Sequence, residues 1–382
     1  MMKKLAICAL SALILISSLT GCGAEGSTAS PTPDPSASPS ASAAPLAEYD
    51  WAGAWAKYDP ETVVMTVNGE DVTWDEYFYW LYREYIEIGY GNELSYYIDN
   101  AGMTLDEFLF NDVEYFCLQY HVLPQQADIL GIELTEEDQA VLDEQLASDI
   151  EHYAGEDGTE EELYEALADI YVTRDVYETV NRMAVLYPRV FMSLYGASGE
   201  QISDEKALAF AEEYNFVTAK HILFRTTDDS GNDLSDAEKE EKRSQAQAAL
   251  DELNAVPESE RAALFDAIME ERSEDPGLAS YPDGYSYEAG VGIMMSEFDD
   301  AVLALEPGGI SGIVESPSGY HIIMRESVGP DTEVMLSATD VYPLRYACAV
   351  YNFNEQFVGW MDDAEVVYSS EFENFLPSSL FE

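Results

Sequence analysis

Two histidines stand out as residues that could carry chemistry, because each sits inside a strongly apolar run. His221 lies in Ala-Lys-His-Ile-Leu-Phe at 219–224, and His321 lies in Gly-Tyr-His-Ile-Ile-Met at 319–324. One histidine in an apolar strand is usually a hydrogen-bonded core residue. Two such strands in a chain with only four histidines favour a shared site instead. We expect the two imidazoles to face each other on one sheet.

The remaining histidines, His121 and His152, do not suggest a metal site. Neither has a second pair of ligands at the spacing typical of zinc. The Asp-rich turn at 226–233 does not match an EF-hand either, because Gly231 is misplaced for a calcium loop. We therefore expect no metal and no cofactor, and we assign both histidines to ordinary helices.

A segment of mixed structure, residues 216–328, must position His221 and His321. Its order of elements is typical of an α+β domain with a small, mostly antiparallel sheet surrounded by helices. The patterns predict strands at 218–224, 310–314 and 320–325, and helices at 235–253, 258–271 and from Ser296 onward.

Residues 49–215, which precede this segment, predict a mainly helical module that begins with a β-hairpin. The hairpin has an Asn-Gly turn at 68–69. Thr-x-x-Glu capping boxes at Thr73, Thr104 and Thr159 predict helix starts, and Gly131 predicts a helix C-cap.

The C-terminal segment, residues 329–382, is patterned as a helix followed by a single strand at 364–368. A single strand needs a partner, because its backbone polar groups must be satisfied. We expect the strand to pair with the free edge of the N-terminal hairpin, so that this segment packs back on the helical module. The 216–328 domain is then an insertion in that module.

The charge balance excludes one class of function. The chain has 75 acidic residues against 17 Lys and Arg, a formal net charge of −58. A nucleic-acid binder needs a basic surface to displace counterions from phosphates, so we expect no nucleic-acid partner. The same charge disfavours electrostatic binding to anionic lipid. It is consistent with simple solubility through self-repulsion, or with cationic clients.

The N-terminus is typical of an export signal. Lys3 and Lys4 precede an apolar stretch at 5–16 that is too short to span a bilayer comfortably. The following Leu-Thr-Gly-Cys at 19–22 resembles the lipobox of bacterial lipoproteins. That resemblance implies a signal peptide at 1–21, lipid attached to Cys22 and an extracytoplasmic protein anchored to the outer face of the cell membrane. A Ser/Ala/Pro-rich linker at 22–48 then separates the anchor from the folded part.

Cys8 lies in the expected signal peptide, so two further cysteines remain, Cys117 and Cys348. In an exported protein two distant thiols could form a disulfide. Both lie in apolar helical contexts, so buried free thiols are an equal alternative.

Five motifs in residues 216–327 together resemble the parvulin type of peptidyl-prolyl isomerase domain. The lipobox, the hairpin with its helices and the returning tail are similar to the PrsA/SurA type of extracytoplasmic foldase, although motifs outside the parvulin segment are weak. The five motifs are Lys-His-Ile-Leu at 220–223, Ser-Glu-Asp-Pro at 273–276, Glu-Phe-Asp-Asp-Ala at 297–301, Pro-Gly-Gly-Ile-Ser at 307–311 and Gly-Tyr-His-Ile-Ile at 319–323.

This resemblance implies roles for particular residues. A carboxylate attacks amides poorly, so Asp275 is expected to shape the electric field and not to act as a nucleophile. The loop at 285–293 is longer than the family pattern, which leaves Tyr287 as a less certain pocket residue. The implied site comprises the facing pair His221 and His321, Asp275 where the family has Cys or Asp, the proline pocket Met294 and Phe298, and the hydroxyls of Ser318 and Ser316.

The function that the resemblance implies is a lipid-anchored peptidyl-prolyl cis-trans isomerase and foldase. Its partners would be unfolded or partly folded exported polypeptides with X-Pro bonds. The alternative is a holdase chaperone with an inactive parvulin domain, supported only by the altered loop. A solute-binding lipoprotein is disfavoured, because the sequence has no two-lobed α/β repeat.

Overall fold

The protein divides into two compact units, each described here by itself. The structure is a computed structural model that describes residues 49–89, 92–99, 101–337 and 340–382. Unit 1 contains residues 49–193 together with Asn354–Glu382, and unit 2 contains Leu194–Phe353. The predicted signal peptide, the lipidated Cys22 and the linker at 22–48 lie outside the described residues.

Unit 2 combines a six-stranded sheet with helices, which confirms the α+β fold class. Its strand order is β10-β9-β6-β5-β8-β7, and all neighbours are antiparallel except β6 and β9. The elements are α8 (Asp204–Glu213), β5 (Phe216–Arg225), α9 (Asp236–Ala255), α10 (Glu258–Arg272), β6 (Tyr285–Glu288), α11 (Ser296–Leu303), β7 (Val314–Ser316), β8 (Gly319–Glu326), β9 (Glu333–Met335), β10 (Val341–Pro343) and the first half of α12 (Leu344–Asp362).

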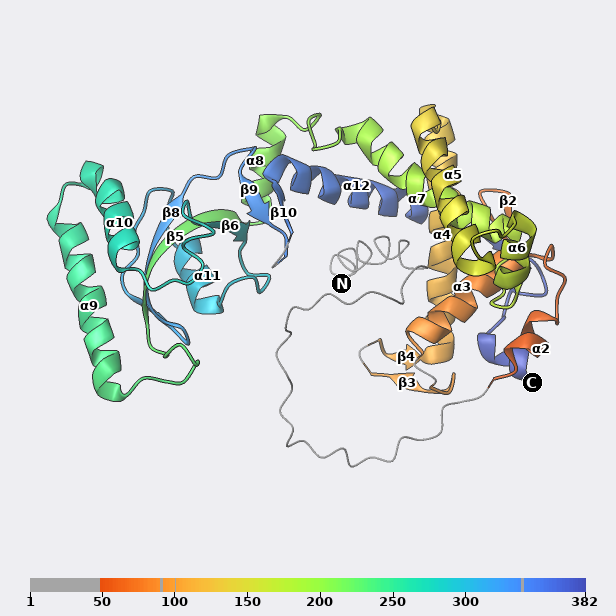
Figure 1. Cartoon of the computed structure of the whole chain (residues 1–382), viewed down its shortest axis with the longest axis horizontal. Coiled ribbons are helices and arrows are strands. Elements are labelled where there is room, and N and C mark those ends of the chain that lie inside the picture. The colour runs from red at the N-terminus through yellow and green to blue at the C-terminus, as the bar shows by residue number, and fades with distance from the viewer. Residues whose placement is uncertain (1–48, 90–91, 100, 338–339) are drawn as a thin grey trace. The chain divides into compact units, whose positions relative to one another are not determined.

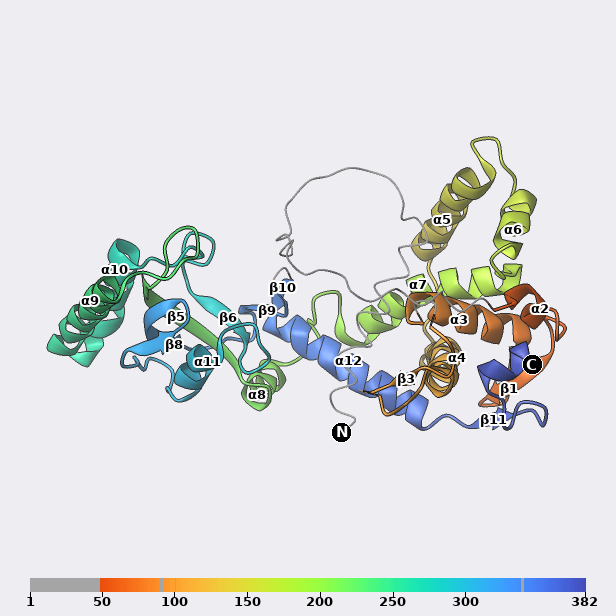
Figure 2. The ribbon, with the colours of Figure 1, turned by 90° about the horizontal axis from the view of Figure 1, so that it is seen from below.

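Alternation along β5 and β8 gives the sheet two different faces. Ile222 and Phe224 of β5 pack with Ile322 of β8 against α9 and α10. Val217 and Ala219 pack on the opposite face, with Phe298 and other residues of α11 (Figures 1 and 2). Because side chains two residues apart share a face, His221 belongs to the α11 face.

Unit 2 extends beyond the expected 216–328 domain at both ends. It includes α8 on one side and β9, β10 and the start of α12 on the other. β9 and β10 remain with this sheet because Met335 pairs with both Tyr287 and Val341. Only the part of the C-terminal segment from Asn354 onward belongs to unit 1.

Unit 1 is mainly helical with a small sheet in the order β11-β1-β2. Within the described residues, none of the helices combines enough length and hydrophobicity to cross a membrane. The elements are α2 (Trp51–Trp55), β1 (Val63–Val67), β2 (Glu70–Thr73), α3 (Trp74–Glu87), β3 (Tyr97–Ile98), β4 (Met103–Thr104), α4 (Leu105–Leu130), α5 (Glu136–Ala154), α6 (Glu160–Ala168), α7 (Arg174–Tyr195), the second half of α12, β11 (Val366–Tyr368) and the 3₁₀ helix η3 (Pro377–Phe381).

The C-terminal strand β11 lies antiparallel beside β1, with Met65 opposite Tyr368. Aromatic residues continue this contact, since the ring of Trp74 packs near Phe372 and Phe375. Large buried aromatic rings contribute most to such a core, because each removes a large apolar area from water. The two ends of the chain's described part therefore stabilise one common core in unit 1.

Most predicted helix signals are present, with one exception. Thr104 and Thr159 form capping boxes, and Gly131 adopts the left-handed conformation at the end of α4. The predicted capping box at Thr73 is wrong: Thr73 precedes α3 but makes no side-chain cap bond, and its hydroxyl donates to Asp75. The Glu76 side chain instead contacts His121 on α4.

Cys117 and Cys348 are both free and buried. Of the two alternatives left open by the sequence, the structure therefore has the free thiols. Burial raises the pKa of each thiol, which keeps both in the neutral, unreactive form.

Candidate active site

His221 and His321 lie on adjacent strands and on the same face of the sheet. The register pairs His321 with Leu223, so the two histidines are diagonal neighbours offset by two residues. Their ring centroids are 5.2 Å apart, and the rings are tilted by 34°. Both side chains are buried. The structure thus brings together the two residues on which the sequence-based hypothesis depends.

The two rings are joined by a hydrogen bond. The Nδ1 atoms of His221 and His321 are 3.2 Å apart, so one must donate while the other accepts. Two protonated rings would place two N–H groups against each other. Burial, and then the nearby His221, lower the pKa of His321 to about 4. His321 is therefore neutral at physiological pH.

Asp275 continues this contact on the other side of His221. Its Oδ2 atom lies 3.0 Å from His221 Nε2, at ion-pair distance but without the angle of a normal hydrogen bond. The carboxylate also accepts from the Tyr285 hydroxyl at 2.8 Å and from the Gly277 N–H at 3.0 Å. Burial alone would raise the pKa of Asp275, but the contacts with His221, Gly277 and Tyr285 outweigh it and lower that pKa.

Ser316 occupies the opposite end of the chain of contacts. Its Oγ atom is 2.7 Å from His321 Nε2. One tautomer assignment is consistent with these contacts: a proton on Nε2 of His221 faces Asp275 at ion-pair distance, Nδ1–H of His321 donates to His221, and Ser316 donates to Nε2 of His321. The result is a continuous polar relay from a hydroxyl to a carboxylate through two imidazole rings.

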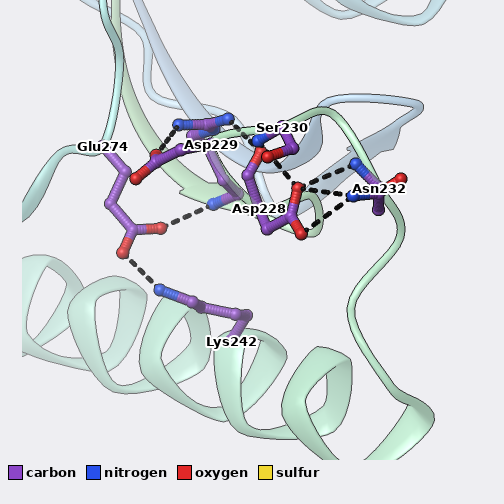
Figure 3. Close-up of polar contacts among 7 residues, drawn as sticks. Asp228, Asp229, Ser230, Asn232, Lys242 and Glu274 are labelled. Atoms are coloured by element: carbon purple, nitrogen blue, oxygen red, sulfur yellow. Dashed lines mark hydrogen bonds and ion pairs between the residues drawn. The ribbon is translucent and has the colours of Figure 1, made fainter.

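Ser273 and Glu274, the two residues before Asp275, attach this segment to β5. The backbone of Leu223 bonds to Ser273 Oγ at 3.1 Å and to the Glu274 N–H at 2.8 Å. The Glu274 carboxylate accepts from the Arg225 N–H at 2.7 Å and contacts Lys242 of α9 (Figure 3). These bonds fix the position of the Asp275 backbone relative to His221, which lies two residues before Leu223 on the same strand.

The acidic turn that follows β5 uses its carboxylates internally. Asp228 accepts from the backbone N–H groups of Ser230 and Asn232, each at 2.9 Å, and Asn232 also bonds it through its side chain (Figure 3). Arg225 reaches the backbone carbonyl of Asp228 and the carboxylate of Asp229. Asp228 therefore stabilises its own turn.

An apolar wall lies beside the histidines. The Phe298 ring contacts both imidazoles edge-on, with centroids 5.3 Å from His221 and 5.6 Å from His321. Met294 is partly buried against the same cluster. Phe298 is itself 2% exposed, so its ring forms the floor of this wall.

Two expected site residues have other positions. Ser316, and not Ser318, bonds His321, whereas the Ser318 hydroxyl faces the sulfur of Met295 at 3.9 Å. The reason is the tight β7–β8 turn, in which Ser316 pairs with Gly319 and its Oγ accepts from the Ser318 N–H. Tyr287 is fully buried and donates to Asp299 at 2.8 Å, so it belongs to the core and does not close the pocket.

Sequence reasoning missed Tyr285, which contacts both Asp275 and His221. One signal could have found it. Tyr285 and Tyr287 alternate on a short strand and so share a face, and β6 pairs with β5 at Ala219 and Val217. This register brings Tyr285 next to the strand position of His221.

Comparisons with known proteins agree with this geometry. The model of the family described as "Rotamase: PPIC-type PPIASE domain" matches residues 221–327. The chain is 31% identical over 161 residues to foldase protein PrsA 4 of Bacillus cereus, which covers 41% of this chain and 54% of that protein. It is 30% identical over 212 residues to foldase protein PrsA of Halalkalibacterium halodurans, which covers 54% of each.

The chain thus spans about half the length of each of these two relatives. A crystal structure of peptidylprolyl isomerase (PrsA) from Bacillus cereus covers 70% of this chain and 88% of that chain at 17% identity, with a TM-score of 0.31. The matched segment includes His221, Asp275, Phe298 and His321, and with their geometry it identifies residues 221–327 as a parvulin domain of the PPIC type, in a chain similar to the PrsA foldases.

Proposed function

We propose that this protein is a peptidyl-prolyl cis-trans isomerase and foldase that assists exported polypeptides outside the cytoplasm. The observation that carries the proposal is the relay from Ser316 through His321 and His221 to Asp275, beside the apolar wall of Phe298. The match of residues 221–327 to the PPIC-type family supports it.

The reaction that such a site must accelerate is a rotation and breaks no bond. Rotation about an X–Pro amide has a barrier of about 18–20 kcal/mol, because the resonance of the peptide group is lost. Uncatalysed exchange takes tens of seconds or longer. An enzyme accelerates the rotation only by binding the twisted amide better than the planar one.

The residues of the site suit this selection. Met294, which is partly buried against the cluster that contains Phe298, offers an apolar contact for the proline ring. The carbonyl of a planar amide carries more negative charge than that of a twisted amide, so a poorly solvated position near the Asp275 carboxylate disfavours the planar state. His221 contacts this carboxylate and helps to hold it in place. No cofactor is required for any of these effects.

The N-terminal sequence and the relatives support the proposed site of action. The lipobox-like sequence that ends at Cys22 supports a lipid anchor at the outer face of the cell membrane. The two similar proteins are named foldases. We infer that the clients are unfolded or partly folded exported chains with X-Pro bonds.

A proline-peptide exchange assay on the full chain tests the isomerase. We expect His221→Ala and Asp275→Ala to reduce kcat/KM by at least about tenfold, because each removes a preorganised polar group of the site. His152→Ala is the matched control, since His152 is exposed on α5 of unit 1. Wild-type rates no higher than those of the two site variants would exclude catalysis.

A client aggregation assay tests the foldase part separately. Full-length wild type and His221→Ala are added to a denatured client at equal concentrations. We expect both to suppress aggregation, while only the wild type speeds proline-limited refolding. Failure of both proteins to protect any client would exclude the chaperone part and leave the isomerase assay unaffected.

A further inference from the structure

Tyr285 makes a contact with Asp275 that the roles assigned so far do not explain. Its hydroxyl donates to Asp275 Oδ2 at 2.8 Å, the same oxygen that lies 3.0 Å from His221 Nε2. One carboxylate oxygen therefore faces both the tyrosine and the histidine. A bond from Tyr285 fixes the rotation of the carboxylate and with it the distance to His221.

The surroundings of Tyr285 are built to hold this hydroxyl in place. Its ring packs on Tyr281, with centroids 4.9 Å apart, and meets His221 edge-on at 5.7 Å. Register places Tyr285 opposite Ala219 on β5, two residues before His221. The side chain is 9% exposed. Contacts on several sides leave the ring little freedom to turn its hydroxyl away from Asp275.

Gly277 provides the space that the hydroxyl needs. A Cβ atom at this position would lie 1.9 Å from the Tyr285 hydroxyl oxygen, which is far inside van der Waals contact. The Gly277 N–H also donates to Asp275 Oδ1 at 3.0 Å. The two carboxylate oxygens are thus held by different donors, Oδ1 by Gly277 and Oδ2 by Tyr285.

Tyr285 is a donor over the whole working pH range. Burial and the adjacent Asp275 carboxylate both raise the pKa of its hydroxyl. The proton therefore stays on the tyrosine and can stabilise the ionised carboxylate. The hydroxyl in turn contributes to lowering the pKa of Asp275.

We propose that Tyr285 is a positioning residue of the isomerase, which fixes the Asp275 carboxylate against His221 through one hydrogen bond in the space left by Gly277. This inference rests on the proposed function, because it assigns Tyr285 to the same site. Tyr285 acts through Asp275 and contacts no reacting atom.

Tyr287 offers a matched comparison on the same strand. It lies on the same face two residues away, is also buried, and also donates to a carboxylate, that of Asp299. A Tyr-to-Phe change at either position removes one buried hydroxyl and keeps the ring. The two variants therefore lose similar amounts of stability and differ in which carboxylate loses its donor.

The experiment measures kcat/KM against pH for full-length wild type, Tyr285→Phe and Tyr287→Phe. We expect Tyr285→Phe to lower kcat/KM roughly fivefold at neutral pH. We also expect the acid limb of the profile, where kcat/KM falls at low pH, to move to higher pH, because Asp275 loses a donor that favours its ionised form. Tyr287→Phe should keep the acid limb of the wild type. A ¹³C titration of the Asp275 carboxyl reports the same shift without any need for activity.

A second variant tests the same contact by filling the space that the Tyr285 hydroxyl occupies. Gly277→Ala should displace the tyrosine hydroxyl and move the acid limb in the same direction as Tyr285→Phe, and the double variant should add little to either change. Identical acid limbs and carboxyl titrations in wild type and Tyr285→Phe would overturn the inference, as would an equal shift in Tyr287→Phe. A wild type without isomerase activity would contradict the proposed function instead, and the carboxyl titration would still test the contact.

Discussion

Half-buried His121 in unit 1 and buried His321 in unit 2 have opposite surroundings. His121 on α4 lies between two carboxylates, with Nε2 2.9 Å from Glu76 and Nδ1 3.7 Å from Glu70. His321 on β8 contacts another imidazole and a serine hydroxyl. The carboxylate nearest to that pair, Asp275, contacts His221.

These surroundings move the two pKa values in opposite directions. Burial lowers the pKa of both rings, but at His121 the contacts with Glu76 and Glu70 outweigh burial and the pKa is raised. At His321 the neighbouring His221 adds to the effect of burial, and the pKa falls to about 4. The partners therefore decide whether the pKa of a ring that burial lowers ends above or below its usual value. His121 links α4 to the carboxylates of Glu70 and Glu76, whereas His321 is a neutral member of a relay.

The largest expected difference between the two histidines is in catalysis. His321→Ala should reduce isomerase kcat/KM by roughly a hundredfold, because it removes the link between Ser316 and His221 in a preorganised site. His121→Ala should leave kcat/KM within about twofold of wild type, although it weakens the contact of α4 with Glu76.

Both variants are measured as full chains in the proline-peptide exchange assay, with circular dichroism to confirm folding. His321→Asn, which keeps a polar side chain, guards against loss of the fold in the alanine variant. Equal activity losses at His121 and His321 would contradict the distinction between a structural link and a site residue.

The next effect is an opposite pH response of the two units. His321 has a lower pKa folded than unfolded, so unit 2 loses stability as pH falls from about 6.5 to about 4. In unit 1 the pKa of His121 is higher in the folded than in the unfolded protein. Protonated His121 therefore stabilises unit 1 at low pH, and unit 1 loses this stabilisation as pH rises. Burial and Asp112 raise the pKa of Glu84 to about 8, so unit 1 also loses stability as pH rises from about 4.5 to 8.

The sequence allows each unit to be followed separately. All five tryptophans, at positions 51, 55, 74, 80 and 360, belong to unit 1, so their fluorescence reports its denaturant unfolding. Histidine-selective ¹³C labelling follows the rings of His121 and His321 in one sample, because the chain has only four histidines. We expect His321 to titrate near pH 4 and His121 above its usual value. Titration of His321 at 6.5 or higher would contradict the neutral relay.

What the sequence could predict depended on local, repeated signals. The apolar runs around His221 and His321 predicted two strands, and their alternation predicted that both rings share a face. The Thr-x-x-Glu pattern predicted helix starts at Thr104 and Thr159 correctly, because a capping box involves only residues three apart. The same pattern failed at Thr73, where the tertiary contact between Glu76 and His121 took the glutamate that the box requires.

The contacts that sequence could not predict depend on loop geometry. Tyr285 meets Asp275 only because Gly277 leaves space for its hydroxyl, and no periodic pattern contains that information. Tyr287 was a candidate pocket residue, but its pairing with Val217 directs it into the core toward Asp299. Ser316 and Ser318 are both serines of one short turn, so residue type alone could not decide between them.

The smallest expected effect separates these two serines. Ser316→Ala removes the partner of His321 Nε2 and should lower kcat/KM roughly fivefold, the effect of about 1 kcal/mol for one hydrogen bond. Ser318→Ala should have little effect, because the Ser318 hydroxyl makes only a weak contact with the Met295 sulfur. Both variants alter the same turn by one oxygen atom, so a general disturbance of the turn would lower both activities equally. A larger loss in Ser318→Ala than in Ser316→Ala would mean that the relay ends at a different hydroxyl. The ¹³C titration of His321 checks this independently, since only the loss of its own partner should move its midpoint.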